Sequence, residues 1–171
     1  MSSHHVIRDK QEPGILILSW EERFPELLEH LCQWSPIIVV DDSCLADFLE
    51  LGLKLNYVIG EKSSWEEKLE YQQPYSLLPS GIDLQEIEKE VMPNFHILGK
   101  LPWELSLSDS HVYYSNGFRY SKLKNGDSIW LGPEQEIVVY NERGEKVITL
   151  KGSSELVQLG DYQNMWIERI A

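Results

Sequence analysis

Two short apolar runs that end in polar residues constrain the fold of this chain more than any other feature. The first is Ile37–Val40, which is followed directly by Asp41 and Asp42, and the second is Tyr57–Ile59, which is followed by a glycine and a glutamate. Apolar runs bounded by turn signals are typical of buried strands. A helix-length segment that stops at Gly52 separates the two runs. The stretch therefore predicts a strand–helix–strand crossover.

Both predicted strands deliver polar side chains at their carboxyl ends. In open α/β sheets the ligand binds outside the carboxyl ends of the strands, so these side chains are expected to face one shared crevice. The candidate residues for that crevice are Asp41, Asp42, Glu61, Ser63 and Ser64. The alternative for the two aspartates is structural, because a turn residue and a helix cap commonly follow a strand.

The segment before the crossover is also predicted to form a strand followed by a helix, and the helix inside the crossover has a predicted start and end. The near-continuous apolar run Gly14–Trp20 predicts a central strand that is covered on both faces. Apolar residues recur at helical spacing over 24–31, and the serine–proline pair that follows should end that helix near Trp34. Ser43 is expected to cap the helix of the crossover, with Gly52 as the left-handed residue past its end.

Further elements are predicted between the crossover and residue 99. Residues 65–71 predict a brief surface helix, and 75–78 predict a short strand. Asp83 has Glu86 three positions later, which is the capping-box arrangement at the start of a helix. Residues 95–98 predict another strand. The sequence up to this point favours a three-layer α/β fold with an open, mostly parallel sheet.

After Gly99 the apolar spacing changes from a helical to a strand period. Asn116-Gly117 lies between two aromatic-rich arms, which is a strong hairpin signal. Apolar runs separated by turn residues follow at 129–131, 137–140, 147–150, 156–159 and 165–167. This spacing predicts an antiparallel all-β sandwich or barrel. We therefore expect two domains, an α/β domain over 1–99 and a β-rich domain over 100–171.

Charge and apolar content limit the partners of the chain. Its 171 residues include 15 basic and 28 acidic side chains, for a net charge of -13. This balance argues against nucleic acid and anionic lipid as partners, and favours a small molecule or another protein chain. No apolar stretch is long enough for a membrane span and no leader pattern is present, so a cytoplasmic location is expected. Cys32 and Cys44 have no spacing typical of a zinc site or a disulfide framework.

Counted back from Gly60, the chain resembles the thiamine pyrophosphokinases. In that family the N-terminal domain has a strand ending in Asp-Gly-Gly, a helix ending before Leu-Gly-Ile-Lys-Pro-Asp, and a strand opening into Gly-Asp-x-Asp-Ser. Asp42 matches the first aspartate without a gap, and Leu51–Lys54 matches the end of the helix. Gly60 and Ser64 match the first and last residues of the acidic loop.

The chain also departs from the family pattern, and the departures fall on the catalytic acids. Ser43 and Cys44 replace the two glycines, Leu55 and Asn56 replace Pro-Asp, and Glu61 and Ser63 replace the two loop aspartates. A later Asp-x-x-x-Asp pattern of the family keeps only Asp83, for which a helix cap is the alternative role. No counterpart of the family's Arg-x-Asp-His segment follows Leu98.

The resemblance implies a site for Mg²⁺ and ATP if the chain is active. Transfer of pyrophosphate requires positioning and neutralisation of phosphate charge, which magnesium on carboxylates provides. Asp42 and Glu61 are then the expected catalytic residues and metal ligands. The expected ligand-binding residues are Asp41, Ser43, Gly60, Ser63, Ser64 and Asp83.

Two functions remain open at this stage. The first is a shortened thiamine pyrophosphokinase-like protein with weakened or lost transfer of pyrophosphate from ATP to thiamine, which keeps a crevice for a small molecule of the thiamine or nucleotide class. The second is an active thiamine diphosphokinase that uses Mg-ATP through Asp42 and Glu61. The replaced carboxylates favour the first, because a lost magnesium ligand removes charge neutralisation. The family's second half, a β-domain, further implies a homodimer.

Overall fold

The fold was analysed in a computed structural model of the chain. It describes residues 13–61, 66–105, 110–124, 127–152, 154–159 and 165–170. The chain divides into two compact units, Met1–His96 and Ile97–Ala171. Each unit is described by itself below. Within the described residues, no helix is long and apolar enough to cross a membrane.

The first unit alternates strands with helices. Its elements are β1 (Gly14–Ile17), α1 (Phe24–Leu31), η1 (Cys32–Trp34), β2 (Ile38–Asp41), η2 (Asp42–Cys44), α2 (Leu45–Glu50), β3 (Tyr57–Ile59), α3 (Glu66–Leu69), η4 (Glu70–Gln72), β4 (Ser76–Leu78), α4 (Leu84–Glu90) and β5 (Phe95–Leu98), which runs across the division. The pairs β1 with β2, β2 with β3 and β3 with β4 are all parallel. The prediction of adjacent parallel strands is therefore confirmed.

Strand β1 is buried along its whole length, and β2 and β3 are buried at all but one residue each. Ile15, Leu16 and Ile17 are consecutive in β1 and each is at most 1% exposed. Successive strand residues point to opposite faces, so both faces of β1 must be covered. Phe24 and Leu28 of α1 and the apolar face of α2 are buried as well. This burial explains why the strands read as continuous apolar runs in the sequence.

One predicted helix cap is wrong and another is confirmed. The residue that caps η2 is Asp41 and not Ser43, since the Asp41 carboxylate accepts a hydrogen bond from the Ser43 amide. Cys44, at the N-cap of α2, makes no side-chain capping bond. Asp83 does cap α4, but its carboxylate accepts from the amide of Gln85 and not from that of Glu86. Short polar side chains reach different amides of the first turn, and the sequence alone does not select among them.

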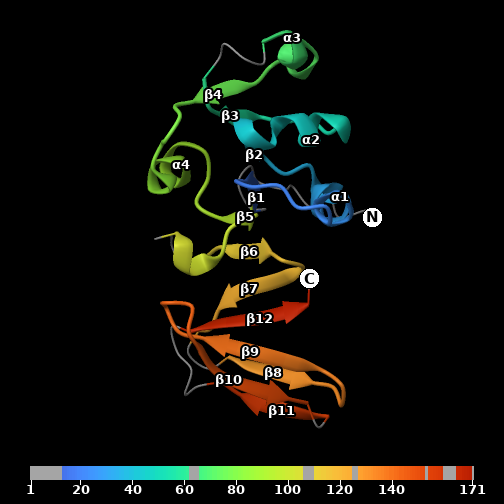
Figure 1. Ribbon diagram of the computed structural model, residues 1–171, viewed down its shortest axis with the longest axis vertical. Coiled ribbons are helices and arrows are strands. Elements are labelled where there is room, and N and C mark those ends of the chain that lie inside the picture. The colour runs from blue at the N-terminus through green and yellow to red at the C-terminus, as the bar shows by residue number, and fades with distance from the viewer. Residues whose placement is uncertain are drawn as a thin grey trace, which may run out of the picture. The chain divides into compact units, whose positions relative to one another are not determined.

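The second unit is built from antiparallel strands. Its elements are η5 (Pro102–Glu104), β6 (Val112–Ser115), β7 (Phe118–Lys122), β8 (Ser128–Leu131), β9 (Glu136–Tyr140), β10 (Lys146–Lys151), β11 (Glu155–Gln158) and β12 (Trp166–Ile170). Five of these strands follow the hydrogen-bonded order β10-β9-β12-β7-β6, while β8 and β11 pair separately. Figure 1 shows β12 between β7 and β9. The predicted antiparallel pairing is confirmed, whereas the sandwich or barrel stays a prediction.

The turn between β6 and β7 has the conformation that its sequence predicts. Asn116 and Gly117 have φ values of 55° and 78°. Positive φ at both central residues is the mark of the type I′ turn, which matches the twist of the two strands. Another part of this unit is held by a buried apolar cluster, Leu123, Val139, Leu159 and Ile167.

Candidate functional site

Asp42 lies directly over Gly60 at the carboxyl edge of the first unit's sheet. Asp41 of β2 is level with Ile59 of β3, so the residues that follow the two strands come together. A β-carbon built on Gly60 would lie 2.6 Å from Cγ and 2.7 Å from Cβ of Asp42. Gly60 also has a φ of 149°, and its amide donates to the carbonyl oxygen of Leu78 at 3.0 Å. The approach of Asp42 to β3 therefore requires glycine at position 60.

Asp41 is engaged within its own turn. Its Oδ1 accepts hydrogen bonds from the amide of Ser43, at 3.0 Å, and from the hydroxyl of Ser43. The carboxylate thus holds η2 and directs the chain from β2 into α2. The structural alternative for Asp41 is confirmed, and a ligand would have to compete with these two donors.

The remaining predicted site residues lie in different settings. Glu61 is exposed just after Gly60. Asp83 begins α4, where its carboxylate is used by the amide of Gln85 at 2.9 Å. Ser63 and Ser64 lie outside the described residues. Of the predicted set, the structure brings Asp42 and Gly60 together and places Glu61 next in the chain.

Cys44 is a buried thiol beside these acids. Its side chain is 1% exposed, and its Sγ lies 3.8 Å from the hydroxyl oxygen of Ser43. Burial raises the pKa of the Cys44 thiol to about 11, with smaller contributions in the same direction from the charges of Asp41, Asp47 and Asp42. The thiol is therefore protonated at neutral pH, and it is neither a nucleophile nor a metal ligand in this state.

The carboxylates at this edge do not fit a magnesium cluster. Asp41 and Asp83 are each used by backbone amides, which leaves Asp42 and Glu61. Residues 62–65 of the loop, Lys-Ser-Ser-Trp, add no carboxylate. Among the described residues, no group of three or more His, Cys, Asp or Glu side chains is placed to hold a metal ion. Magnesium is usually held by carboxylates together with substrate phosphates, and here the protein supplies few of them.

Asn56 and Gln72 hold the opposite, amino end of the strands, and the sequence reading assigned them no role. Oδ1 of Asn56 accepts from the amide of Ile38 at 2.8 Å, and its backbone bonds to Ile38 and Ser76 tie β2, β3 and β4 together. The Gln72 carboxamide accepts from the amide of Leu55 and donates to the carbonyl of Leu53. Neither side chain has a local pattern in the sequence that reveals its distant partner.

A cavity of about 480 Å³ lies elsewhere in the first unit. Ala46, Leu49 and Glu50 of α2 form one side, and Glu67 and Tyr71 form the other. None of the predicted site residues that the structure describes lines it. Tyr71 is 92% exposed, so this cavity is an open depression on the helical surface and not the crevice that the sequence predicts.

The second unit contains a polar link across three strands. One oxygen of Glu168 on β12 accepts hydrogen bonds from the hydroxyls of Tyr120 on β7, at 2.8 Å, and Tyr140 on β9, at 2.9 Å. Burial, and then the hydrogen bond to Glu168, raise the pKa of Tyr140 to about 12. The Trp103 ring contacts both tyrosine rings, with centroids 5.6 and 5.1 Å apart. The aromatic residues of this region therefore serve packing.

Trp130 and Trp166, which both lie on strands of the second unit, differ in exposure. Trp166 is 5% exposed on β12, and its ring packs edge to face against Tyr113. Trp130 is 62% exposed on β8. Trp20, in contrast, lies after the end of β1, where it packs edge to face against Phe24. The predicted first strand therefore ends earlier than its apolar run.

Comparison with known proteins finds relatives by fold alone. No family model matches the chain, and no curated protein matches it. A protein from Lactobacillus plantarum of solved structure is 9% identical, with a TM-score of 0.58 over 92% of this chain and 98% of that chain. A probable thiamine pyrophosphokinase from Staphylococcus saprophyticus is 12% identical, with a TM-score of 0.54 over 92% and 98%.

A third solved structure agrees with these two. The thiamin pyrophosphokinase from Geobacillus thermodenitrificans is 11% identical, with a TM-score of 0.51 over 92% of each chain. The fold of this chain is therefore similar to that of thiamin pyrophosphokinases along almost its whole length.

Proposed function

We propose that this chain is a thiamine pyrophosphokinase-like protein that binds a small molecule of the thiamine or nucleotide class and has weakened or lost pyrophosphate transfer. The observation that carries the proposal is the use of Asp41 and Asp83 by backbone amides. A carboxylate with one oxygen already accepting hydrogen bonds as a cap is a poorer ligand for the magnesium that would neutralise phosphate charge. Asp42 and Glu61 alone are too few for tight binding of magnesium without nucleotide.

The position of Asp42 over Gly60 favours the second candidate, an active thiamine diphosphokinase. A carboxylate held at the carboxyl edge of a parallel sheet lies where ligands of α/β folds bind. In that case Asp42 and Glu61 would hold magnesium together with ATP phosphates. Gly60, Ser43 and the loop serines at 63 and 64 would be ligand-binding positions in either case.

An assay for AMP release with thiamine and Mg-ATP separates the two candidates. We expect no turnover, together with saturable binding of thiamine or of a nucleotide measured by calorimetry. Turnover that is lost in Asp42→Asn and kept in Asp47→Asn, an exposed aspartate on the neighbouring helix, would establish the enzyme instead. Calorimetry with magnesium alone is expected to reach no saturation at micromolar concentration. A tight magnesium site would contradict the proposal.

A further inference from the structure

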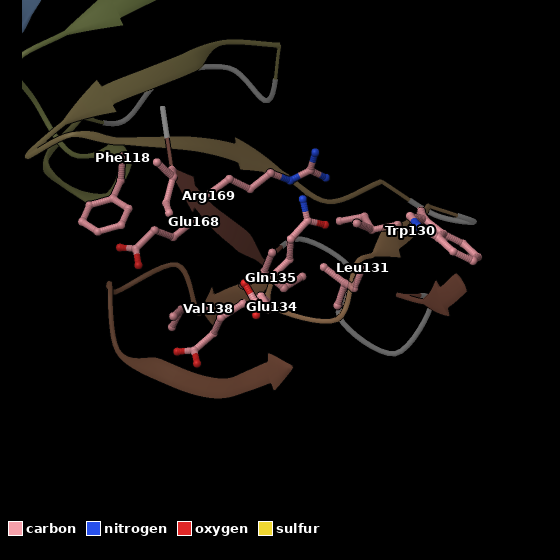
Figure 2. A pocket seen from close by; sticks show the side chains of 12 residues that line it. Phe118, Trp130, Leu131, Glu134, Gln135, Val138, Glu168 and Arg169 are labelled. Atoms are coloured by element: carbon pink, nitrogen blue, oxygen red, sulfur yellow. The ribbon is translucent and has the colours of Figure 1, made fainter. Parts of the chain in front are cut away.

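The second unit contains a cavity that the proposed function does not use. Its volume is about 560 Å³, which is within the usual size of sites for small organic molecules. Strands β7, β8, β9 and β12 and the turn before β9 contribute the lining. Figure 2 shows the side chains that surround it. Every element of this lining belongs to one compact unit, so the cavity is complete within that unit.

One wall of the cavity is aliphatic. Leu131 and Ile137 are 2% and 3% exposed, and Ile129, two positions before Leu131 on β8, faces the same side as Leu131. Trp130 and Ile170 also line the cavity and are 62% and 83% exposed. Large apolar side chains exposed around a cavity favour the binding of a molecule with an apolar body.

Arg169 brings a partly buried cation to the lining of the cavity. Its Nε is buried and has no hydrogen-bond partner among the described residues. Arg119 lies directly opposite it on β7, and two like charges in that position repel each other. Burial lowers the pKa of Arg169, the charge of Arg119 lowers it further, and Asp127 partly offsets both. An unsatisfied buried donor of this kind calls for an explanation, and a missing anionic ligand is one.

Gln135 supplies a second donor. Its Oε1 accepts from the amide of Gly132 at 2.9 Å, so the NH₂ end of the carboxamide is the end left for another partner. The turn is held further because the amide of Gln135 donates to Gly132 and its carbonyl accepts from Gly152. In the view of Figure 2, the Gln135 amide nitrogen points toward the guanidinium of Arg169.

Two of the three carboxylates among the lining residues have partners elsewhere. Glu168 accepts from Tyr120 and Tyr140, and Figure 2 shows it leaving β12 in a different direction from Arg169. Glu136 lies 3.7 Å from the ammonium group of Lys151, and Glu134 is exposed. Their negative charges disfavour a polyanion such as a polyphosphate, while leaving Arg169 free to bind a single negative charge.

We propose that this cavity binds a small organic monoanion, with its carboxylate between Arg169 and Gln135 and its apolar body on the aliphatic wall. An arginine forms paired hydrogen bonds with a carboxylate, and these are stronger than bonds between neutral groups. The site is independent of the one at Asp42. Thiamine is a cation and is not the ligand that these donors select, so the two proposals can fail separately.

The test uses the full chain and naphthoate as the probe, with neutral naphthamide as its isostere. Titration followed by two-dimensional amide NMR is expected to show saturable binding of naphthoate, with shifts confined to residues 128–138 and 168–170. Removal of the charged hydrogen bonds should weaken binding, so naphthamide is expected to bind about tenfold less tightly or worse.

Three variants change the donors, and a fourth is the control. Gln135→Glu retains the acceptor for the Gly132 amide and replaces the NH₂ group with a negatively charged oxygen. The affinity for naphthoate should therefore fall about tenfold. Gln85→Glu, an exposed site in the first unit, makes the same charge change and should have no effect. Arg169→Lys should retain part of the affinity that Arg169→Gln loses. Equal binding of naphthoate and naphthamide, no loss in Gln135→Glu, or no saturation at millimolar naphthoate would each overturn the proposal.

Discussion

The carboxylate-bearing side chain of Asp42 occupies the space that a β-carbon on Gly60 would fill. The closest atom is Oδ2 of Asp42, but Cγ and Cβ would also lie within 2.6 and 2.7 Å, so the overlap is not limited to the mobile end of the side chain. The residue after β2 can therefore lie against the residue after β3, because residue 60 has no side chain. A glycine that the family resemblance marks as the start of a ligand loop is also a requirement of packing.

We expect Gly60→Ala to destabilise the first unit by about 2–4 kcal/mol, from backbone strain together with overlap with Asp42. Gly52→Ala is the matched control. Gly52 has a φ of 66° with nothing within 4 Å of a built β-carbon, so only strain of about 1 kcal/mol is expected there. Urea unfolding measures both. If both variants lose the same unfolding free energy, Asp42 moves away from the new β-carbon without an energetic cost.

Substitution of Asp41 should separate its capping role from a role of its charge. Asp41→Ala removes the acceptor for the Ser43 amide and hydroxyl and is expected to cost about 1 kcal/mol of unfolding free energy. Asp41→Asn keeps a capping oxygen and should remain within a few tenths of a kcal/mol of the parent. Urea unfolding of the two variants at neutral pH gives the comparison. If Asp41→Asn loses as much unfolding free energy as Asp41→Ala, the stabilising effect comes from the charge of Asp41 and not from its capping hydrogen bonds.

The buried thiol of Cys44 should make stability depend on pH in the alkaline range. Its pKa is about 11 in the folded chain against an ordinary value of 9.0. Between these values the unfolded chain loses the proton first, so the stabilising effect is complete below about pH 9 and is lost as the pH rises toward 11. Denaturant unfolding across this range should show a steeper decline in the parent than in Cys44→Ala. If the stability of the parent and of Cys44→Ala declines in parallel as the pH rises, the pH dependence does not come from Cys44.

The β-rich half is expected to form a homodimer. Leu156 on β11 is 54% exposed, and Val147 on the edge strand β10 is 46% exposed. Association would cover these side chains and the unpaired edge of β10. Sedimentation equilibrium at micromolar concentration should give twice the chain mass, and Leu156→Asp or Val147→Asp should shift the protein to monomer.

Tyr71→Asp is the control for these variants, since Tyr71 is exposed in the first unit. It should leave the dimer intact. A clean monomer of the parent chain would defeat the prediction. A dimer that persists after deletion of residues 101–171 would move the interface elsewhere.

The parallel strands of the first unit could be predicted from the sequence because the apolar pattern that marks each strand is local. The runs at β1, β2 and β3 are buried on both faces, so each strand appears as an uninterrupted apolar segment. The same holds for the turn at Asn116-Gly117, where two adjacent residues determine the conformation. The position of Asp42 next to β3 followed from the expectation that parallel strands end together.

The contacts that the sequence did not predict join residues that are far apart in the chain. Asn56 binds the amide of Ile38, and Gln72 binds Leu53 and Leu55, in each case through a polar side chain with no periodic signal. The cavity of the second unit depends on strand pairing, because Arg169 of β12 and Gln135 before β9 both line it and β12 pairs with β9. Local apolar spacing predicts that strands exist but not which strands pair.

The placement of β12 has a consequence for how the chain is made. This strand follows all the others of its sheet in sequence, yet it pairs with both β7 and β9. Until it has been synthesised, the hairpin of β6 and β7 and that of β9 and β10 have no strand to join them. Folding during synthesis can therefore complete the first unit early, whereas the second must wait with open strand edges until residues 166–170 emerge.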